Sequence, residues 1–205
     1  MKKHIIAFIL FYFFCFFESF SQKQTNVWYF GNRAGIDFNG ATPVALTNGA
    51  LNTGEGCAAI SDNTGALLFY TDGVTVWDRT HTPMPGGNGV LMGHASTTQS
   101  ALVVPKPGNN SLYYVFTADA QAKVQPLING FRYSIVDMTV GANGDVTTLN
   151  TLLFGPASEK MTAVRHCNGT SVWVMAHEWL TNAFYAYLVT CAGVSAPVVT
   201  NVGMV

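Results

Sequence analysis

The segment His177-Glu178 carries residue types of a zinc-protease motif, in which two histidines one helical turn apart bind the metal beside a glutamate. The second histidine would have to stand at position 181, where the chain has a threonine. The segment also continues an apolar run rich in Val, Trp and Met, which predicts a strand ending in a turn. We therefore expect no protease chemistry here and place His177 at the end of a strand.

A second histidine, His94, opens a polar run that reaches Ser100, directly before another apolar stretch. Gly93-His94-Ala95-Ser96 breaks the Gly-x-Ser-x-Gly hydrolase pattern at both ends, so it does not indicate a nucleophile. Two interpretations stay open: contact with a ligand near a central funnel, or a polar loop whose side chains satisfy neighbouring backbone groups. The candidate ligand-binding residues are His94, Ser96, Gln99, His177 and Trp179.

Aspartates recur at the ends of predicted strands, at positions 62, 72, 78 and 119. Carboxylates in turns usually accept hydrogen bonds from backbone amides. A calcium site needs about six to eight converging oxygens, and no pair of carboxylates stands out for glycoside hydrolysis. We predict no catalytic residue, no metal ligand and no cofactor.

The aromatic residues allow two interpretations. Trp28, Trp77, Trp173 and Trp179 could line a sugar-binding face, but aromatics in strands more often pack between sheets. We predict core packing, with Trp179 as the exception because it follows the end of a strand.

The cysteines favour no zinc site. Beyond the leader, Cys57, Cys167 and Cys191 lack the close spacing of a zinc ribbon. Cys167 and Cys191 could form a disulfide after export, whereas Cys57 is expected to be a small apolar filler.

The first residues predict export. Lys2 and Lys3 precede an apolar run, Ile5–Phe17, which is shorter than the roughly 20 residues of a membrane span. Serines at positions 19 and 21 fit cleavage before Gln22, so residues 1–21 are predicted to be a signal peptide and the product extracellular or at the cell surface. No second apolar span follows.

With 10 basic and 11 acidic residues, the chain also lacks the basic surface that nucleic acid requires.

The elements that must position these residues are short strands separated by Gly, Asn, Asp and Pro. They repeat as groups over Cys57–Trp77, Gln99–Leu153 and Met161–Val202, at the spacing of propeller blades. We predict an all-β domain over residues 22–205, a partial β-propeller of three to four antiparallel blades, with a β-sandwich as the alternative. Val27–Phe38 lacks an evident local sheet and is expected to supply outer strands of the last blade. The chain would then be an N-terminal part of a longer product with further C-terminal blades.

Several segments resemble the N-terminal propeller-like region of large exported proteins of Bacteroidetes, which typically end in a gliding-motility-associated, type IX secretion sorting domain. The segments are Val27–Asn32, Ala34–Phe38, Glu55–Asp62, Leu68–Gly73, Val76–Asp78 and Gln99–Gly108. The resemblance implies a secreted or surface protein but no common chemistry, and no sorting domain is present in this sequence.

Together these features predict a non-catalytic secreted or cell-surface module for binding or adhesion, with a protein or carbohydrate ligand. The alternative is an exported propeller-fold hydrolase whose catalytic residues lie outside this chain, since propellers host both roles.

Overall fold

The computed structural model describes residues 22–120 and 129–204, which form an all-β structure of antiparallel sheets. The predicted signal peptide, residues 1–21, lies outside the described residues. Sheet 1 comprises β1 (Val27–Phe30), β2 (Ala34–Asp37) and β3 (Val44–Leu46), and sheet 2 comprises β4 (Ala58–Ser61), β5 (Leu67–Thr71) and β6 (Val76–Asp78). Sheet 3 comprises β7 (Ala101–Pro105), β8 (Leu112–Thr117), β9 (Phe131–Asp137) and β10 (Asp145–Phe154). Sheet 4 comprises β11 (Ala157–Arg165), β12 (Val172–Glu178), β13 (Ala183–Thr190), β14 (Gly193–Val194) and β15 (Val198–Asn201).

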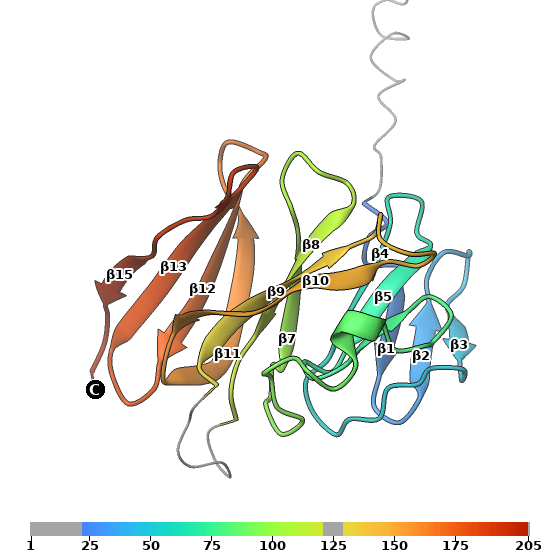
Figure 1. Cartoon of the computed structure of the whole chain (residues 1–205), viewed down its shortest axis with the longest axis horizontal. Coiled ribbons are helices and arrows are strands. Elements are labelled where there is room, and N and C mark those ends of the chain that lie inside the picture. Colours follow the sequence, from blue (N-terminus) through green and yellow to red (C-terminus); the bar gives the residue numbers. More distant parts are fainter. Residues whose placement is uncertain (1–21, 121–128, 205) are drawn as a thin grey trace, which may run out of the picture.

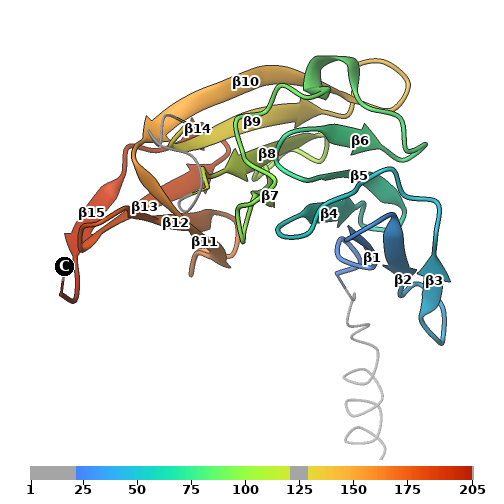
Figure 2. The ribbon, with the colours of Figure 1, turned by 90° about the horizontal axis from the view of Figure 1, so that it is seen from below.

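The four sheets follow one another in chain order as the blades of an open propeller arc (Figure 1). Figure 2 shows β1, β4, β7 and β11 on the concave side of the arc, with the later strands of each sheet outside them. β1 contacts β4, β4 contacts β7, and β7 contacts β11. In a β-sandwich two sheets would face each other, whereas here every sheet packs on its successor. The predicted all-β fold is therefore confirmed, and its four separate antiparallel sheets in chain order are consistent with the predicted partial propeller.

Tight turns of one kind join the first two strands in sheets 2, 3 and 4. In each turn a side-chain oxygen accepts two hydrogen bonds from main-chain amides further along the chain. The donors lie two and four residues after Asp62, and two and three residues after Asn109 and Asn168. Such Asx turns fold the chain back locally and set the register of the hairpin. All three turns lie at one end of the arc, upward in Figure 1, which we call the hairpin end. At the opposite end the chain passes from one sheet to the next.

Aromatic side chains fill the junctions between sheets. Tyr29 stacks on Tyr70 between sheets 1 and 2, with ring centroids 4.6 Å apart, and Phe69 meets Tyr113 edge-on between sheets 2 and 3. Each buried aromatic stabilises the fold by about 1.5–3 kcal/mol relative to exposure. Between sheets 3 and 4 lies Tyr187, whose buried hydroxyl has no hydrogen-bond partner among the described residues, and burial raises its pKa to about 12.

The junction of sheets 2 and 3 also depends on glycines. A β-carbon at Gly56 would lie 2.3 Å from the Ser100 amide nitrogen, and one at Gly73 would lie 2.6 Å from the Ser100 carbonyl oxygen. Gly73 also has a φ of +86°, which disfavours other residues. Only glycine lets the two loops approach the start of β7 so closely.

An irregular segment completes sheet 2 on its outer side. The Met84 and Leu91 amides donate to carbonyls of β6 and the residues before it, and the short 3₁₀ turn η1 (Pro85–Gly87) lies between them. Asn150, in a bulge of β10, holds the same segment: its side chain accepts from the Met92 amide and donates to the Val90 carbonyl. Sheets 2 and 3 are thus linked on their outer side as well.

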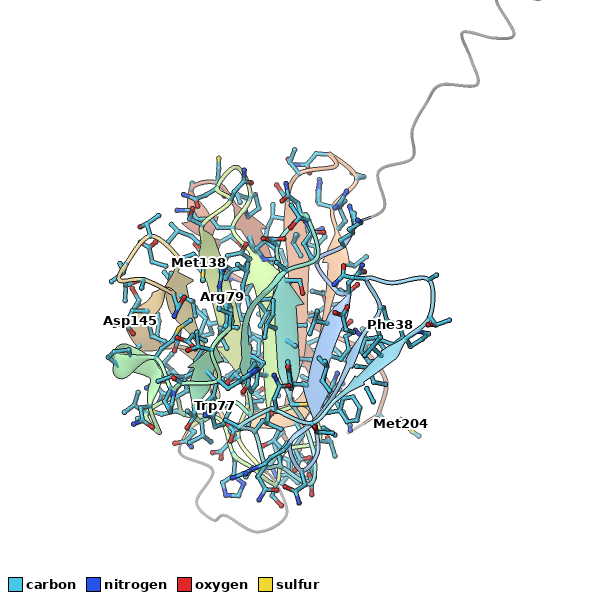
Figure 3. All side chains as sticks on the ribbon, turned by 90° about the vertical axis from the view of Figure 1, so that its right-hand side faces the viewer. Phe38, Trp77, Arg79, Met138, Asp145 and Met204 are labelled. Atoms are coloured by element: carbon cyan, nitrogen blue, oxygen red, sulfur yellow. The ribbon has the colours of Figure 1, made fainter. Side chains whose placement is uncertain are left out.

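Two expectations need correction. Val27–Phe38 has a local sheet, because β2 pairs with β3, a three-residue strand that the sequence pattern did not reveal. Trp28 was expected in the core but is 50% exposed, because its register partner Ile36 and the rest of its face point away from sheet 2. Figure 3 views this side of the molecule and shows Phe38, whose ring meets Trp28 edge-on, beside the strands of sheet 1.

Candidate functional site

The predicted residues His94 and Ser96 lie in the loop before β7, at the end opposite the hairpin turns. The His94 Nδ1 atom accepts a hydrogen bond from the Ser96 amide at 3.0 Å, and the Ser96 hydroxyl reaches the Glu55 carboxylate at 3.5 Å. His94 therefore contacts the Ser96 main chain rather than its hydroxyl. The pair forms a local turn and not a nucleophile with its base.

The rest of this polar run connects sheet 3 to its neighbours. The Ser100 hydroxyl donates to the Gly56 carbonyl, and Thr98 contacts the side chains of Glu159 and Lys160 at the start of β11. The Gln99 carboxamide oxygen accepts from the Met161 amide at 3.0 Å, where a bulge interrupts the pairing of β11 with β12. Much of the run thus satisfies backbone groups, which was the second interpretation of the sequence.

Gln99 and His177 nevertheless line the same hollow, of about 340 Å³, on sheet 4. Its other walls include Lys160, Met175 and Phe184, and the His177 and Phe184 rings lie 4.6 Å apart. The structure therefore brings together two of the predicted residues, and their role in binding stays a prediction. Trp179 does not line this hollow: it is partly buried in the turn after β12, where its amide donates to the Pro156 carbonyl.

The aspartates at strand ends cap turns, as predicted. Asp78 accepts from the amides of Thr80 and Thr82, from the Thr80 hydroxyl and from the Asn143 side chain. Burial alone would raise the pKa of Asp78, but these hydrogen bonds outweigh it and hold the pKa below its ordinary value. The same balance lowers the pKa of Asp62. These carboxylates are occupied by their own turns and are not free to act as acids or bases.

Among the described residues, no group of three or more His, Cys, Asp or Glu side chains could hold a metal ion. The neighbours Cys167 and His166 also pair a nucleophilic group with a base, with Sγ and Nδ1 3.7 Å apart. The same nitrogen accepts from the Asn168 amide, so this contact belongs to the exposed tip of the β11–β12 hairpin.

The disulfide that the sequence allowed between Cys167 and Cys191 is not formed in the structure, where both thiols are free and exposed. Cys57 is partly buried, as a small apolar filler would be. Burial raises the pKa of its thiol, and the Asp72 carboxylate adds to the effect.

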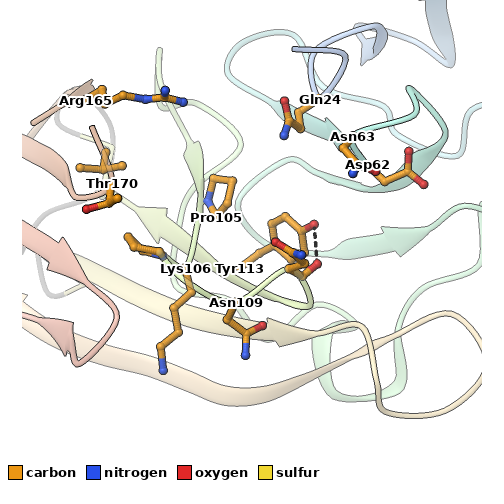
Figure 4. A pocket seen from close by; sticks show the side chains of 12 residues that line it. Gln24, Asp62, Asn63, Pro105, Lys106, Asn109, Tyr113, Arg165 and Thr170 are labelled. Atoms are coloured by element: carbon orange, nitrogen blue, oxygen red, sulfur yellow. Dashed lines mark hydrogen bonds between the residues drawn. The ribbon is translucent and has the colours of Figure 1, made fainter. Parts of the chain in front are cut away.

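A larger polar cleft lies at the hairpin end, with a volume of about 370 Å³ (Figure 4). Side chains from the hairpin turns of sheets 2, 3 and 4 surround it, together with Gln24 from the segment before β1. The residues whose polar groups line it include Gln24, Asn63, Lys106, Asn110, Tyr113, Arg165 and Thr170.

The polar groups of the cleft differ in how they are engaged. The Asp62 and Asn109 side chains cap their own turns, and the Tyr113 hydroxyl donates to the Asn110 carbonyl at 3.2 Å. Within the described ranges, the side chains of Gln24, Asn63, Lys106 and Arg165 make no hydrogen bond or ion pair. Two amides and two cations are therefore left to bind something else.

Sequence reasoning missed this cleft. Its residues lie in turns whose composition indicates only a change of chain direction, and the turns are 40 or more residues apart. One signal was available: in a propeller, equivalent turns of successive blades meet at the same end, so cations at equivalent positions can face one cleft. Lys106 and Arg165 both follow the last apolar residue of a first strand.

No helix in the described part of the chain is long and apolar enough to cross a membrane. Comparison with known protein families, with curated proteins and with solved structures finds no match for this chain.

Proposed function

We propose that this chain is a non-catalytic, secreted or cell-surface binding module, and that the hairpin-end cleft binds an acidic carbohydrate. The observation that carries the proposal is the set of four unengaged side chains, Gln24, Asn63, Lys106 and Arg165, around a cleft of about 370 Å³.

The chemistry of these groups favours a ligand that is both anionic and rich in hydroxyls. A guanidinium can bind a carboxylate through two parallel hydrogen bonds, and an ammonium adds a point charge. Carboxamides both donate and accept, which suits hydroxyl groups. Among the described residues that line the cleft, Asp62 is the one carboxylate against two cations, and its oxygens are turned to the amides of its own turn, so positive charge is in excess there.

The location part of the proposal rests on the N-terminal sequence. A basic head, a short apolar run and serines before Gln22 favour export, and the resemblance to exported surface proteins agrees with it. The binding part does not depend on the route of secretion.

The test compares galacturonic acid oligomers with galactose oligomers of equal length by isothermal titration calorimetry. We expect binding of the acidic series only, and about tenfold or greater weakening in Arg165→Ala, because a charge-assisted pair is worth more than a neutral hydrogen bond. Arg79→Ala removes the same charge from an exposed position outside the cleft and should bind normally.

Two results would contradict the proposal: equal or absent binding of both series, or unchanged affinity in Arg165→Ala. Chromatography of the recovered oligomers completes the test. Intact oligomers agree with a binding module, whereas shortened oligomers would favour the hydrolase alternative.

A further inference from the structure

The pairing of β11 with β12 is interrupted by a bulge, which opens sheet 4 near the loop that precedes β7. The register jumps between Ala157 and Met161, so that residues 158–160 lie opposite His177 alone. The Met161 amide donates to the Oε1 atom of Gln99, which comes from that loop, at 3.0 Å. The bulge thus brings a side chain from the edge of sheet 3 against sheet 4, where the hollow of about 340 Å³ lies.

One wall of this hollow is apolar. Met175 and His177 lie two residues apart on β12 and therefore share a face of the sheet, and Phe184 is the register partner of His177 on β13. All three line the hollow, and the His177 and Phe184 rings lie 4.6 Å apart. Met175 and Phe184 thus offer apolar surface directly beside an imidazole.

The polar groups that are left to bind a ligand are mainly donors. The Gln99 Oε1 atom is engaged by an amide, which can only donate, so the orientation of the carboxamide is fixed and its NH₂ group is left over. The Lys160 ammonium donates to the Thr98 hydroxyl at 2.6 Å and keeps further protons to donate. Within the described residues the His177 ring makes no hydrogen bond, and it always offers at least one N–H. None of the described residues that line the hollow is acidic.

We propose that this hollow binds small carboxylic acids that carry an aromatic or branched aliphatic group. The carboxylate accepts hydrogen bonds from the Gln99 amide and the Lys160 ammonium, and the ammonium also supplies the opposite charge. The apolar group lies against Met175 and Phe184, where it loses contact with water. A volume of about 340 Å³ is within the range of small-molecule sites. This site is independent of the hairpin-end cleft.

Other classes of ligand use only part of the lining. A metal cation would meet the Lys160 ammonium and no carboxylate. A neutral sugar would form no ion pair with that ammonium, and an inorganic anion would leave the apolar surface of Met175 and Phe184 in water. An acid with an apolar group engages both the donors and the apolar wall.

Two sources supply this chemistry: a free organic acid, and the C-terminal residue of a polypeptide that ends in an apolar side chain. The probes are therefore 3-phenylpropionate and N-acetylglycylphenylalanine, which carry the same ring and carboxylate. Tighter binding of the second probe would identify a polypeptide end as the ligand, and tighter binding of the first a free acid. Their neutral amides test the need for the charge.

NMR titration of the purified protein, at a concentration at which it is monomeric, measures the binding. We expect 3-phenylpropionate to shift the side-chain amide signals of Gln99 and the main-chain amide signal of Met161 saturably, with a dissociation constant of about 1 mM. The neutral 3-phenylpropionamide, and acetate, which lacks the apolar group, should each bind about tenfold or more weakly.

Matched variants assign the effect to the hollow. Lys160→Met removes the charge but keeps a long side chain and should weaken binding about tenfold, whereas Arg79→Ala removes a charge from an exposed position elsewhere and should bind normally. Met175→Thr should weaken binding about threefold or more, and Val164→Thr, on the same face of sheet 4 but outside the hollow, should not.

Three results would overturn the proposal. The first is equal binding of the acid and its amide, and the second is the absence of saturable shifts at Gln99 and Met161 up to about 20 mM probe. The third is a saturable shift at Lys106 and Arg165 instead, which would place the anion in the hairpin-end cleft.

Discussion

At the residue scale, short polar side chains in this protein act mainly on the main chain near them. Asp62, Asp72, Asp78 and Asp137 each bind amides of the next few residues, and Asn109 and Asn168 do the same without a charge. The carboxylates could be predicted to be turn caps because the reason is local in sequence. The unengaged Arg165 and Gln24 could not be predicted to share a cleft, because that depends on how distant turns meet.

Asp78 tests the energetic part of this argument. It is 8% exposed and accepts hydrogen bonds from two amides and two side chains, so Asp78→Ala should lower the free energy of unfolding by about 2–3 kcal/mol. Asp78→Asn keeps an acceptor for the turn and should cost less. Chemical denaturation at neutral pH measures both, and equal stability of Asp78→Ala and the parent protein would contradict the assignment.

The same residue makes a pH prediction. Its pKa in the folded protein is below the ordinary value of 3.8, so the stability it contributes is fully present above that pH. That stability is lost as the pH falls through the lower folded pKa. The free energy of unfolding of the parent protein, measured by denaturation at a series of pH values, should therefore fall more steeply below pH 3.8 than that of Asp78→Asn. Asp62, whose pKa is also lowered, should account for part of the pH dependence that remains in Asp78→Asn.

At the scale of elements, the repeat of strands was readable because each complete sheet has the same order of apolar runs and turns. β3 was not, since three residues, two of them exposed, carry no alternating pattern. The outer segment of sheet 2 was missed for a related reason: its pairing with β6 is interrupted by η1, and it depends on a contact with Asn150 in another sheet. Its register is set by tertiary contacts and not by its own residues.

Asn150 also allows the cost of its backbone conformation to be measured. Its φ is +54°, and its side chain makes two hydrogen bonds to the segment before β7, at 2.9 and 2.8 Å. Asn150→Gly loses the bonds but keeps a relaxed backbone, whereas Asn150→Ala also takes on a left-handed conformation that costs about 1–2 kcal/mol. We expect Asn150→Ala to be the less stable of the two by about 1 kcal/mol in thermal and chemical unfolding. Equal stability of the two variants would mean that the backbone of the bulge changes conformation and avoids the left-handed strain in Asn150→Ala.

At the scale of the whole molecule, the two end sheets differ from the middle ones in having one face that no other described sheet covers. On sheet 4 the register places Val164, Trp173 and Leu188 side by side, and next to them Met175, Ala186 and Val198. On sheet 1 the uncovered face carries Trp28 and Ile36. Antiparallel sheets with one wet face normally alternate apolar and polar residues, and these strands do not.

Such faces should promote association of the protein with itself. Val164 is 60% exposed, Met175 37% and Val198 56%, and contiguous apolar surface of this kind is uncommon on monomers. We expect sedimentation velocity to show association that increases with protein concentration. Replacing Val164, Met175 and Val198 together by threonine should weaken it about tenfold or more, because the apolar area available for burial falls. The matched control replaces Val140, Leu149 and Leu152, which are 40%, 45% and 54% exposed on sheet 3 and its β9–β10 turn, and should associate like the parent. A parent protein that stays monomeric at every concentration would show that water alone covers these faces.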